Sequence, residues 1–405
     1  MPERFDWRIQ QCTAGALCGR GGRGCSILIP MRFACFLSIS LALQVATGQV
    51  PKQRPTASSD ALLNAAISAQ QHHDYKTAIE DYRKVLAMQP GLGEARANLG
   101  SALAADGQLD AAIEEDTKAL DVAPDKTAVR MNLGLAYYKK GDVQHAHDLF
   151  QIVHAARPSD VSAAVLLAYT DIKVDKVAEA AKLLGPMENG HENDMDFQYV
   201  YGYALIETGK GLEGLPRMEK VAKATRSVDA YFIAASERMQ RSQFAEARSD
   251  TEAALKIDPT FPGLYTLAGQ ACDALGDTDT SVPDFQAALH QNPRDAMANL
   301  YLGVTRMKQR DFESARPLLE LALELNPGLP LARLQLAKLD AMTGKSAEAA
   351  ATLEELEKHD PDWLDPHVEL APLYYKLHRP ADGDRERAIV AQIQARQQQA
   401  GPRDK

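Results

Sequence analysis

Apolar side chains recur at spacings of three and four residues from about residue 59 to residue 377, which is the period of helices that bury one face. Gly and Pro positions, rather than polar linkers, separate these amphipathic segments. Aromatic residues are only 6% of the chain, and alanine is abundant. The pattern predicts about 20 helices of about 12–14 residues each, joined by tight turns.

Prolines recur along this pattern at intervals of 34 residues. The interval from Pro158 to Pro259 is one residue short of three periods, which places two degenerate repeats near 161–227. A constant period of this size is the sequence signature of a repeat array. The prolines on the lattice are Pro90, Pro124, Pro158, Pro259, Pro293, Pro327 and Pro361.

Small residues occupy two positions in every repeat. With the proline numbered 32, positions 8 and 20 hold only Gly, Ala or Ser in all ten repeats, so two helices can cross closely there. Glycine at position 15 is predicted to end the first helix in a left-handed conformation, and the proline ends the second. The glycines at position 15 are Gly107, Gly141, Gly209, Gly276 and Gly344.

The segment MNLGLAYYKKGDVQHAHDLFQIVHAARP (131–158) carries Leu, Gly, Tyr, Gly, Ala, Phe and Pro in the order of a tetratricopeptide repeat, and the chain resembles that family over about residues 59–377. The resemblance implies an all-α fold, a right-handed α-solenoid of about ten stacked helix pairs with a C-terminal capping helix. The fourth and fifth repeats lack the terminal proline, so residues 185–194 are predicted to form an irregular loop. The repeats start near residues 59, 93, 127, 161, 195, 228, 262, 296, 330 and 364.

Both ends of the chain differ from the repeats. Residues 378–405 are predicted to form the capping helix, with Ile389 and Ile393 facing inward, followed by a disordered tail. Residues 1–48 are interpreted as an upstream extension followed by a signal peptide, Met31–Gly48, and residues 49–58 as a linker. The alternatives are a true start at Met1 and an uncleaved N-terminal anchor.

Composition and motifs argue against several functions. The formal net charge of −10 disfavours nucleic acid as a partner. After residue 48 the chain has only Cys272, which is expected to be a buried small side chain, so neither a disulfide nor a thiolate metal cluster is predicted. No nucleotide-binding loop, serine-nucleophile motif or zinc-protease motif is present. The chain is therefore predicted not to be an enzyme and to need no cofactor or metal.

Two histidine pairs and one acidic stretch are candidate metal ligands. His72 with His73, and His145 with His147, have no further ligand near them in the sequence and are interpreted as helix surface. The acidic stretch 191–194 lacks calcium-loop spacing and is interpreted as a solvated loop. A weak cation site in that loop is the alternative.

The resemblance implies that the first helices of successive repeats line a concave groove that binds extended peptides or helices. Groove-facing candidates are positions 2, 5, 6, 9, 12 and 13. Asn64, Asn98 and Asn132 share position 6; their amides can pair with a peptide backbone, similar to the asparagine ladder of the family's glycosyltransferase members. The alternatives are that the asparagines only follow the family consensus and that some of the apolar candidates pack between repeats. The apolar and aromatic candidates are Met131, Leu135, Tyr138, Val165, Tyr169, Ile172, Tyr199, Tyr203 and Phe232.

The function predicted from these features is an exported, non-enzymatic scaffold, periplasmic or secreted, that binds a peptide or protein segment in its groove. Nucleic acid, a membrane span in the mature chain and a small-molecule substrate are not expected. The alternatives are a structural component of an envelope assembly or polysaccharide-export machine, a non-catalytic subunit of an enzyme complex, and a metal-dependent enzyme that uses the loop at 191–194.

Overall fold

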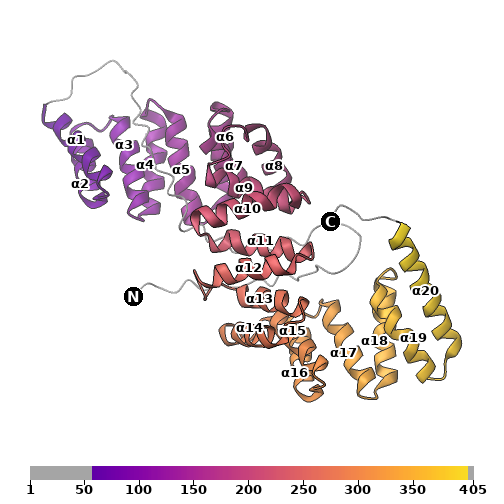
Figure 1. Cartoon of the computed structure of the whole chain (residues 1–405). Helices are drawn as coiled ribbons and strands as arrows, with labels where there is room; N and C mark the ends of the chain where they lie inside the picture. The colour runs from indigo at the N-terminus through magenta and orange to yellow at the C-terminus, as the bar shows by residue number, and fades with distance from the viewer. Residues whose placement is uncertain (1–56, 400–405) are drawn as a thin grey trace. The chain divides into compact units, whose positions relative to one another are not determined.

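The computed structural model describes residues 57–399, which form 20 α-helices and one short 3-10 helix and contain no strand (Figure 1). The described residues divide into two compact units, one ending at Val221 and the other beginning at Ala222. The predicted all-α fold of stacked helix pairs is confirmed. The predicted signal peptide, most of the linker and the end of the tail lie outside the described residues.

The compact unit that ends at Val221 contains the first five helix pairs. Its irregular element is η1 (Gly185–Met187), a 3-10 turn that follows the shortest helix. Its last helix, α10, runs across the division between the units. The helices are α1 (Ala57–Gln71), α2 (Tyr75–Met88), α3 (Gly93–Ala105), α4 (Leu109–Val122), α5 (Lys126–Lys140), α6 (Val143–Ala156), α7 (Val161–Lys173), α8 (Val177–Leu184), α9 (Met195–Glu207) and α10 (Gly211–Thr225).

The compact unit that begins at Ala222 contains the other five pairs. Its helices are α11 (Val228–Gln240), α12 (Phe244–Leu255), α13 (Leu264–Ala274), α14 (Thr278–Gln291), α15 (Ala296–Lys308), α16 (Phe312–Leu325), α17 (Pro330–Met342), α18 (Ser346–His359), α19 (Leu364–Lys376) and α20 (Pro380–Gln399). The second helices of seven repeats end before the prolines that recur every 34 residues, as predicted.

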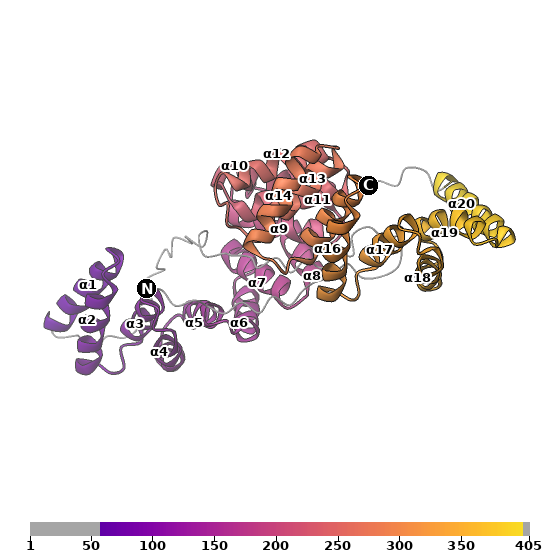
Figure 2. The same ribbon diagram turned by 90° about the horizontal axis from the view of Figure 1, so that it is seen from below.

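Helices that follow one another in the chain pack together within each compact unit, as α3 does with α4 and α19 with α20 (Figure 2). First helices of neighbouring repeats also touch, for example α3 with α5 and α13 with α15. A single helix pair could not bury its own apolar side, so this stacking creates the core. Within the described residues, no helix is long and apolar enough to cross a membrane.

The small residue at position 8 makes room for the large side chain at position 24 of the same repeat. A Cβ added to Gly134 would lie 2.6 Å from Cε1 of Phe150, and one added to Gly269 would lie 2.6 Å from Cε1 of Phe285. Both phenylalanines are completely buried. The close helix crossing predicted from the small-residue column is therefore used to bury an aromatic ring.

The left-handed turn at position 15 occurs in all ten repeats. The five glycines predicted to adopt it have φ between 77° at Gly276 and 92° at Gly344, which confirms the prediction. The other five repeats adopt the same turn without glycine, so the stacked helices impose the geometry even where it strains a side chain. These residues are His73 (φ 61°), Asp175 (63°), Ser242 (57°), Arg310 (61°) and His378 (59°).

The irregular loop predicted at 185–194 is present, and local hydrogen bonds hold it. Asp194 caps α9 by accepting from the backbone N–H of Asp196 and Phe197, both at 3.1 Å. Oε1 of Glu192 accepts from the N–H of Gly190 at 3.1 Å. These acidic side chains therefore serve to shape the loop and to begin α9.

Helix α20 packs against α19 and completes the tenth helix pair. The predicted capping helix and the second helix of the tenth repeat are thus the same element. Ile393 is buried and Ile389 is half-buried, so the predicted inward face is present.

Candidate functional site

Side chains at the predicted groove positions touch across neighbouring first helices, and we call this surface the first-helix face. The Tyr138 hydroxyl on α5 donates to the Tyr169 hydroxyl on α7 at 2.8 Å. Lys308 on α15 pairs with Asp273 on α13 at 2.8 Å. A further pair joins Lys338 on α17 to Glu369 on α19 at 2.9 Å. The repeat register therefore identifies the side of each pair that the first helices share.

Four of the predicted apolar groove residues are not available to a partner in this structure. Val165, Tyr169, Tyr199 and Tyr203 are at most 8% exposed, although they were expected on a solvated face. The reason is that α7 and α9 are apolar on almost every side, and such helices are buried all round. For these four, packing between repeats, the alternative stated above, describes the structure.

Three other candidates lie half-buried on α5. Met131, Leu135 and Tyr138 pack their inner parts against Phe150 and its neighbours and keep the rest accessible. Ile172 near the end of α7 is also half-buried. These four side chains are the accessible part of the predicted apolar patch in the compact unit that ends at Val221.

Phe232 belongs to the other compact unit. Its side chain packs against Leu267 and Ala271, and its ring centroid lies 5.5 Å from that of Phe261. Phe232 and Tyr138 lie in different compact units, so a patch that includes both stays a prediction.

The three asparagines at position 6 have different surroundings. Asn64 is exposed, whereas Asn98 and Asn132 are half-buried. The Asn98 side chain lies beside the Tyr82 hydroxyl, which donates to Oε1 of Gln70 at 2.8 Å. Asn98 thus contributes to the polar boundary between the first two repeats, while Asn64 is free to meet a partner.

The structure adds two exposed apolar residues to the first-helix face. Met342 on α17 is 52% exposed and Val368 on α19 is 43% exposed. They occupy positions 13 and 5, and the Lys338–Glu369 pair joins the same two helices. The repeat register could have identified both, because their positions belong to the groove set.

A second feature that sequence reasoning missed is a buried carboxylate on α4. Asp116 is completely buried, and neither of its oxygens has a hydrogen-bond partner among the described residues. It occupies position 24, which holds Phe150 and Phe285 in other repeats. Burial, with a smaller contribution from Glu115, raises the pKa of Asp116 to about 8. The available signal was an acidic residue at a position that is apolar or aromatic in seven of the ten repeats.

Cys272 is buried, as predicted, on α13. Burial raises the pKa of its thiol to about 11, so the thiolate is scarce at neutral pH. His147 of the predicted surface pair is also buried, and its Nε2 lies 2.8 Å from Oδ1 of Asp171. The interpretation of His147 as helix surface was wrong, because this side chain points between α6 and α7.

Several known proteins are similar to this chain. A family model described as tetratricopeptide repeat matches residues 63–127 and 266–330, and a second model with that description matches residues 306–371. No curated protein matches the chain.

Similar solved structures include a tetratricopeptide repeat protein from Parabacteroides merdae, with 17% identity, a TM-score of 0.46, and coverage of 61% of this chain and 98% of that one. The Cut9–Hcn1 hetero-tetramer of the APC/C has 15% identity and a TM-score of 0.44, covering 83% and 87%. Yeast Tom70 has 14% identity and a TM-score of 0.36, covering 85% and 97%. Together with the period and the helix pairs, the family-model matches identify residues 63–127 and 266–371 of this chain as tetratricopeptide repeats.

Proposed function

We propose that this protein is a non-enzymatic interaction scaffold that binds a peptide or protein segment on its first-helix face. The observation that carries the proposal is the set of accessible apolar side chains on α5 and α7. Met131, Leu135, Tyr138 and Ile172 supply apolar and aromatic contact area beside the half-buried amide of Asn132. Methionine and tyrosine are enriched at the centres of protein interfaces.

A peptide or protein segment fits this face better than a small molecule. The contacting side chains are spread over the sides of successive helices, and an extended chain can follow them from one repeat to the next. The amides of Asn64 and Asn132 at position 6 offer both a donor and an acceptor to a peptide backbone. The apolar side chains would provide selectivity for the partner's side chains.

We also propose that the protein is exported and acts in the periplasm or outside the cell. The support is the order of Arg32, an apolar run and small residues at Ala46 and Gly48. N-terminal sequencing of the protein isolated from its native cells tests this proposal. A chain that begins near Gln49 is expected, and a mature chain that retains residues 1–30 would contradict export by this signal.

Crosslinking mass spectrometry on the native envelope fraction is the experiment that tests the scaffold proposal. Crosslinks from a partner should concentrate on α5 and α7, and Leu135→Asp should remove them without lowering the melting temperature by more than a few degrees. Ile152→Asp is the matched control, because Ile152 is an exposed apolar residue on a second helix. Equal loss with both variants, or crosslinks confined to second helices, would contradict the proposal.

The same experiment separates the alternative assemblies. A catalytic chain recovered in constant stoichiometry would identify the protein as a subunit of an enzyme complex. Crosslinks to several envelope components at once would favour a structural role in an export machine.

A further inference from the structure

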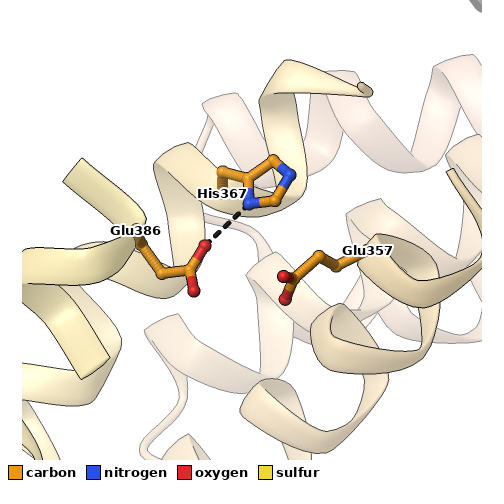
Figure 3. A group of neighbouring side chains, drawn as sticks. All are labelled: Glu357, His367 and Glu386. Carbon is orange, nitrogen blue, oxygen red and sulfur yellow. Dashed lines mark hydrogen bonds and ion pairs between the residues drawn. The ribbon is translucent and has the colours of Figure 1, made fainter. Parts of the chain in front are cut away.

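Three side chains from three consecutive helices meet at the C-terminal end of the repeats. Glu357 on α18, His367 on α19 and Glu386 on α20 point toward one another (Figure 3). One potential ligand atom from each lies within 4.8 Å of the others, and Nδ1 of His367 is 2.7 Å from Oε2 of Glu386. His367 and Glu386 are buried, and Glu357 is partly buried.

The hydrogen-bond partner of Nε2, the other ring nitrogen of His367, shows that this nitrogen carries a hydrogen. Nε2 lies 3.0 Å from the carbonyl oxygen of Pro361, which can only accept a hydrogen bond. The same position of other repeats donates to the equivalent proline carbonyl. Nε2 of His367 therefore carries a hydrogen, and Nδ1 is the ring nitrogen whose lone pair a metal ion could use. The equivalent bonds are Arg96 to Pro90 at 3.0 Å, Asn299 to Pro293 at 3.2 Å and Arg333 to Pro327 at 3.0 Å.

In the second repeat, an arginine binds both the proline carbonyl and the carboxylate at these positions. Arg96 and Glu115 occupy the positions of His367 and Glu386, and they form an ion pair at 2.6 Å. Arginine is permanently charged and supplies hydrogens to both the proline carbonyl and the carboxylate. Histidine reaches the same contact only with a second hydrogen on Nδ1, so either a proton or a metal ion must lie between Nδ1 and the Glu386 carboxylate.

Glu357 favours a metal ion over a proton between His367 and Glu386. It occupies position 28, which is leucine in five other repeats, and it directs a second carboxylate toward the same point. A proton between His367 and Glu386 would leave Glu357 close to another carboxylate without a donor of its own. A divalent ion would bind all three groups, and its charge would balance the two carboxylates. The leucines at position 28 are Leu86, Leu120, Leu255, Leu289 and Leu323.

We propose that Glu357, His367 and Glu386 bind a divalent transition metal ion, of which Zn²⁺ is the best fit, and that this ion joins α18, α19 and α20. One imidazole nitrogen and two carboxylate oxygens are ligands that zinc accepts. Tetrahedral ligands at about 2.0–2.2 Å from zinc are about 3.3 Å apart. This distance lies between the 2.7 Å from Nδ1 of His367 to Oε2 of Glu386 and the 4.8 Å within which all three ligand atoms lie. The hydrogen bond from Nε2 to a backbone carbonyl is the usual outer support of a metal-bound histidine.

The expected consequence is local stabilisation of α20. Among the described residues this helix packs mainly against α19, and a bound ion would also join it to α18. A bound ion would add a link that the apolar core does not provide. The fourth coordination position would remain for water or for a donor from another molecule.

The test uses untagged full-length protein that has been treated with a chelator and returned to metal-free buffer. Titration with ZnCl₂, followed by calorimetry and elemental analysis, should show one bound ion per chain. Amide hydrogen exchange in α20 should slow at least about tenfold on addition of Zn²⁺. With Co²⁺ in place of zinc, the visible spectrum should be that of a four-coordinate N/O site.

Two variants make the test specific. Glu357→Leu introduces the residue that five other repeats have at this position, so it should fold normally and lose both zinc binding and the effect on α20. Asp171→Asn is the matched control, because it alters the other buried histidine–carboxylate pair and should leave zinc binding unchanged. Absence of stoichiometric Zn²⁺ or Co²⁺ binding by the wild type, or undiminished binding by Glu357→Leu, would overturn the proposal and leave a proton-linked pair in its place.

Discussion

Gly100 on α3 faces Asp116 on α4 so closely that a Cβ at Gly100 would collide with the carboxylate. The equivalent contact in other repeats joins a glycine to an aromatic ring or a leucine, as Gly303 joins Leu319. The second repeat therefore buries a polar group at the point where its neighbours bury an apolar one. An unpaired polar group in such a place opposes folding.

Replacement of Asp116 by leucine should stabilise the protein. The Gly303–Leu319 contact shows that leucine is accommodated opposite a glycine at these positions. Removal of the buried carboxylate and burial of a larger apolar side chain should raise the free energy of unfolding by about 2–4 kcal/mol at neutral pH. Urea denaturation followed by circular dichroism measures the change. Asp121→Leu, at an exposed site near the end of the same helix, is the control and should change stability by less than about 0.5 kcal/mol.

The effect of Asp116 should depend on pH. Its pKa is about 8 in the folded protein, whereas an aspartate in an unfolded chain titrates near about 3.9. Between these values the folded state keeps a proton that the unfolded state has released, so its contribution to stability falls as pH rises. The advantage of Asp116→Leu over the wild type should grow from about pH 4 to about pH 8 and then level off. A difference that does not vary with pH would contradict the buried, protonated state.

Glycine at a strained turn should also stabilise the fold. Arg310 adopts φ 61° at position 15 and is exposed, and no ion pair or hydrogen bond of its side chain is present in the described structure. Arg310→Gly should raise stability by roughly 0.5–1 kcal/mol, because the left-handed conformation costs glycine nothing. Gly344→Ala, at the same position of the next repeat, should lower stability by about 1 kcal/mol. Thermal unfolding of both variants checks the two signs together.

Backbone amides in residues 185–227 should exchange faster than those of the second, third, seventh and eighth repeats. Helix α8 has only 8 residues and is followed by the 3-10 turn η1, so this stretch has fewer helical hydrogen bonds. Repeat arrays open first where the interface between neighbours is poorest. Hydrogen-exchange mass spectrometry on the isolated protein measures this. Uniform protection across the repeats would show that the hydrogen bonds of Glu192 and Asp194 compensate for the shorter helix.

The repeat register predicted the helices and their turns because each depends on residues within one 34-residue repeat. Gly276 and Pro293 act on their own backbone, so their effect can be read locally. Exposure depends on the neighbouring helices instead, which is why Tyr199 and Tyr203 were expected on a solvated face and are buried. A set such as Glu357, His367 and Glu386 requires the relative placement of three helices. The sequence signal for it was only a glutamate at a position that is leucine in five of the ten repeats.

The asparagines at position 6 provide the last prediction. Asn64 is exposed and Asn132 is half-buried, and neither forms a side-chain hydrogen bond in the described structure. Asparagine is a poor residue in the middle of a helix, so alanine at these two positions should leave stability unchanged or slightly higher. Asn98→Ala should differ, because it removes a group beside Tyr82 and should cost up to about 1 kcal/mol.

If the amides hold a peptide backbone, alanine at these positions should weaken partner binding even where stability is not lowered. The variant with Asn64, Asn98 and Asn132 all changed to alanine should bind the crosslinked partner about 1–3 kcal/mol more weakly, measured by calorimetry with the purified partner segment. Asn193→Ala, an exposed asparagine in the loop before α9, serves as the control and should bind normally. Full affinity in the triple variant would mean that these asparagines only follow the repeat consensus. Recognition on the first-helix face would then depend on apolar residues such as Leu135 and Tyr138, which the Leu135→Asp variant tests separately.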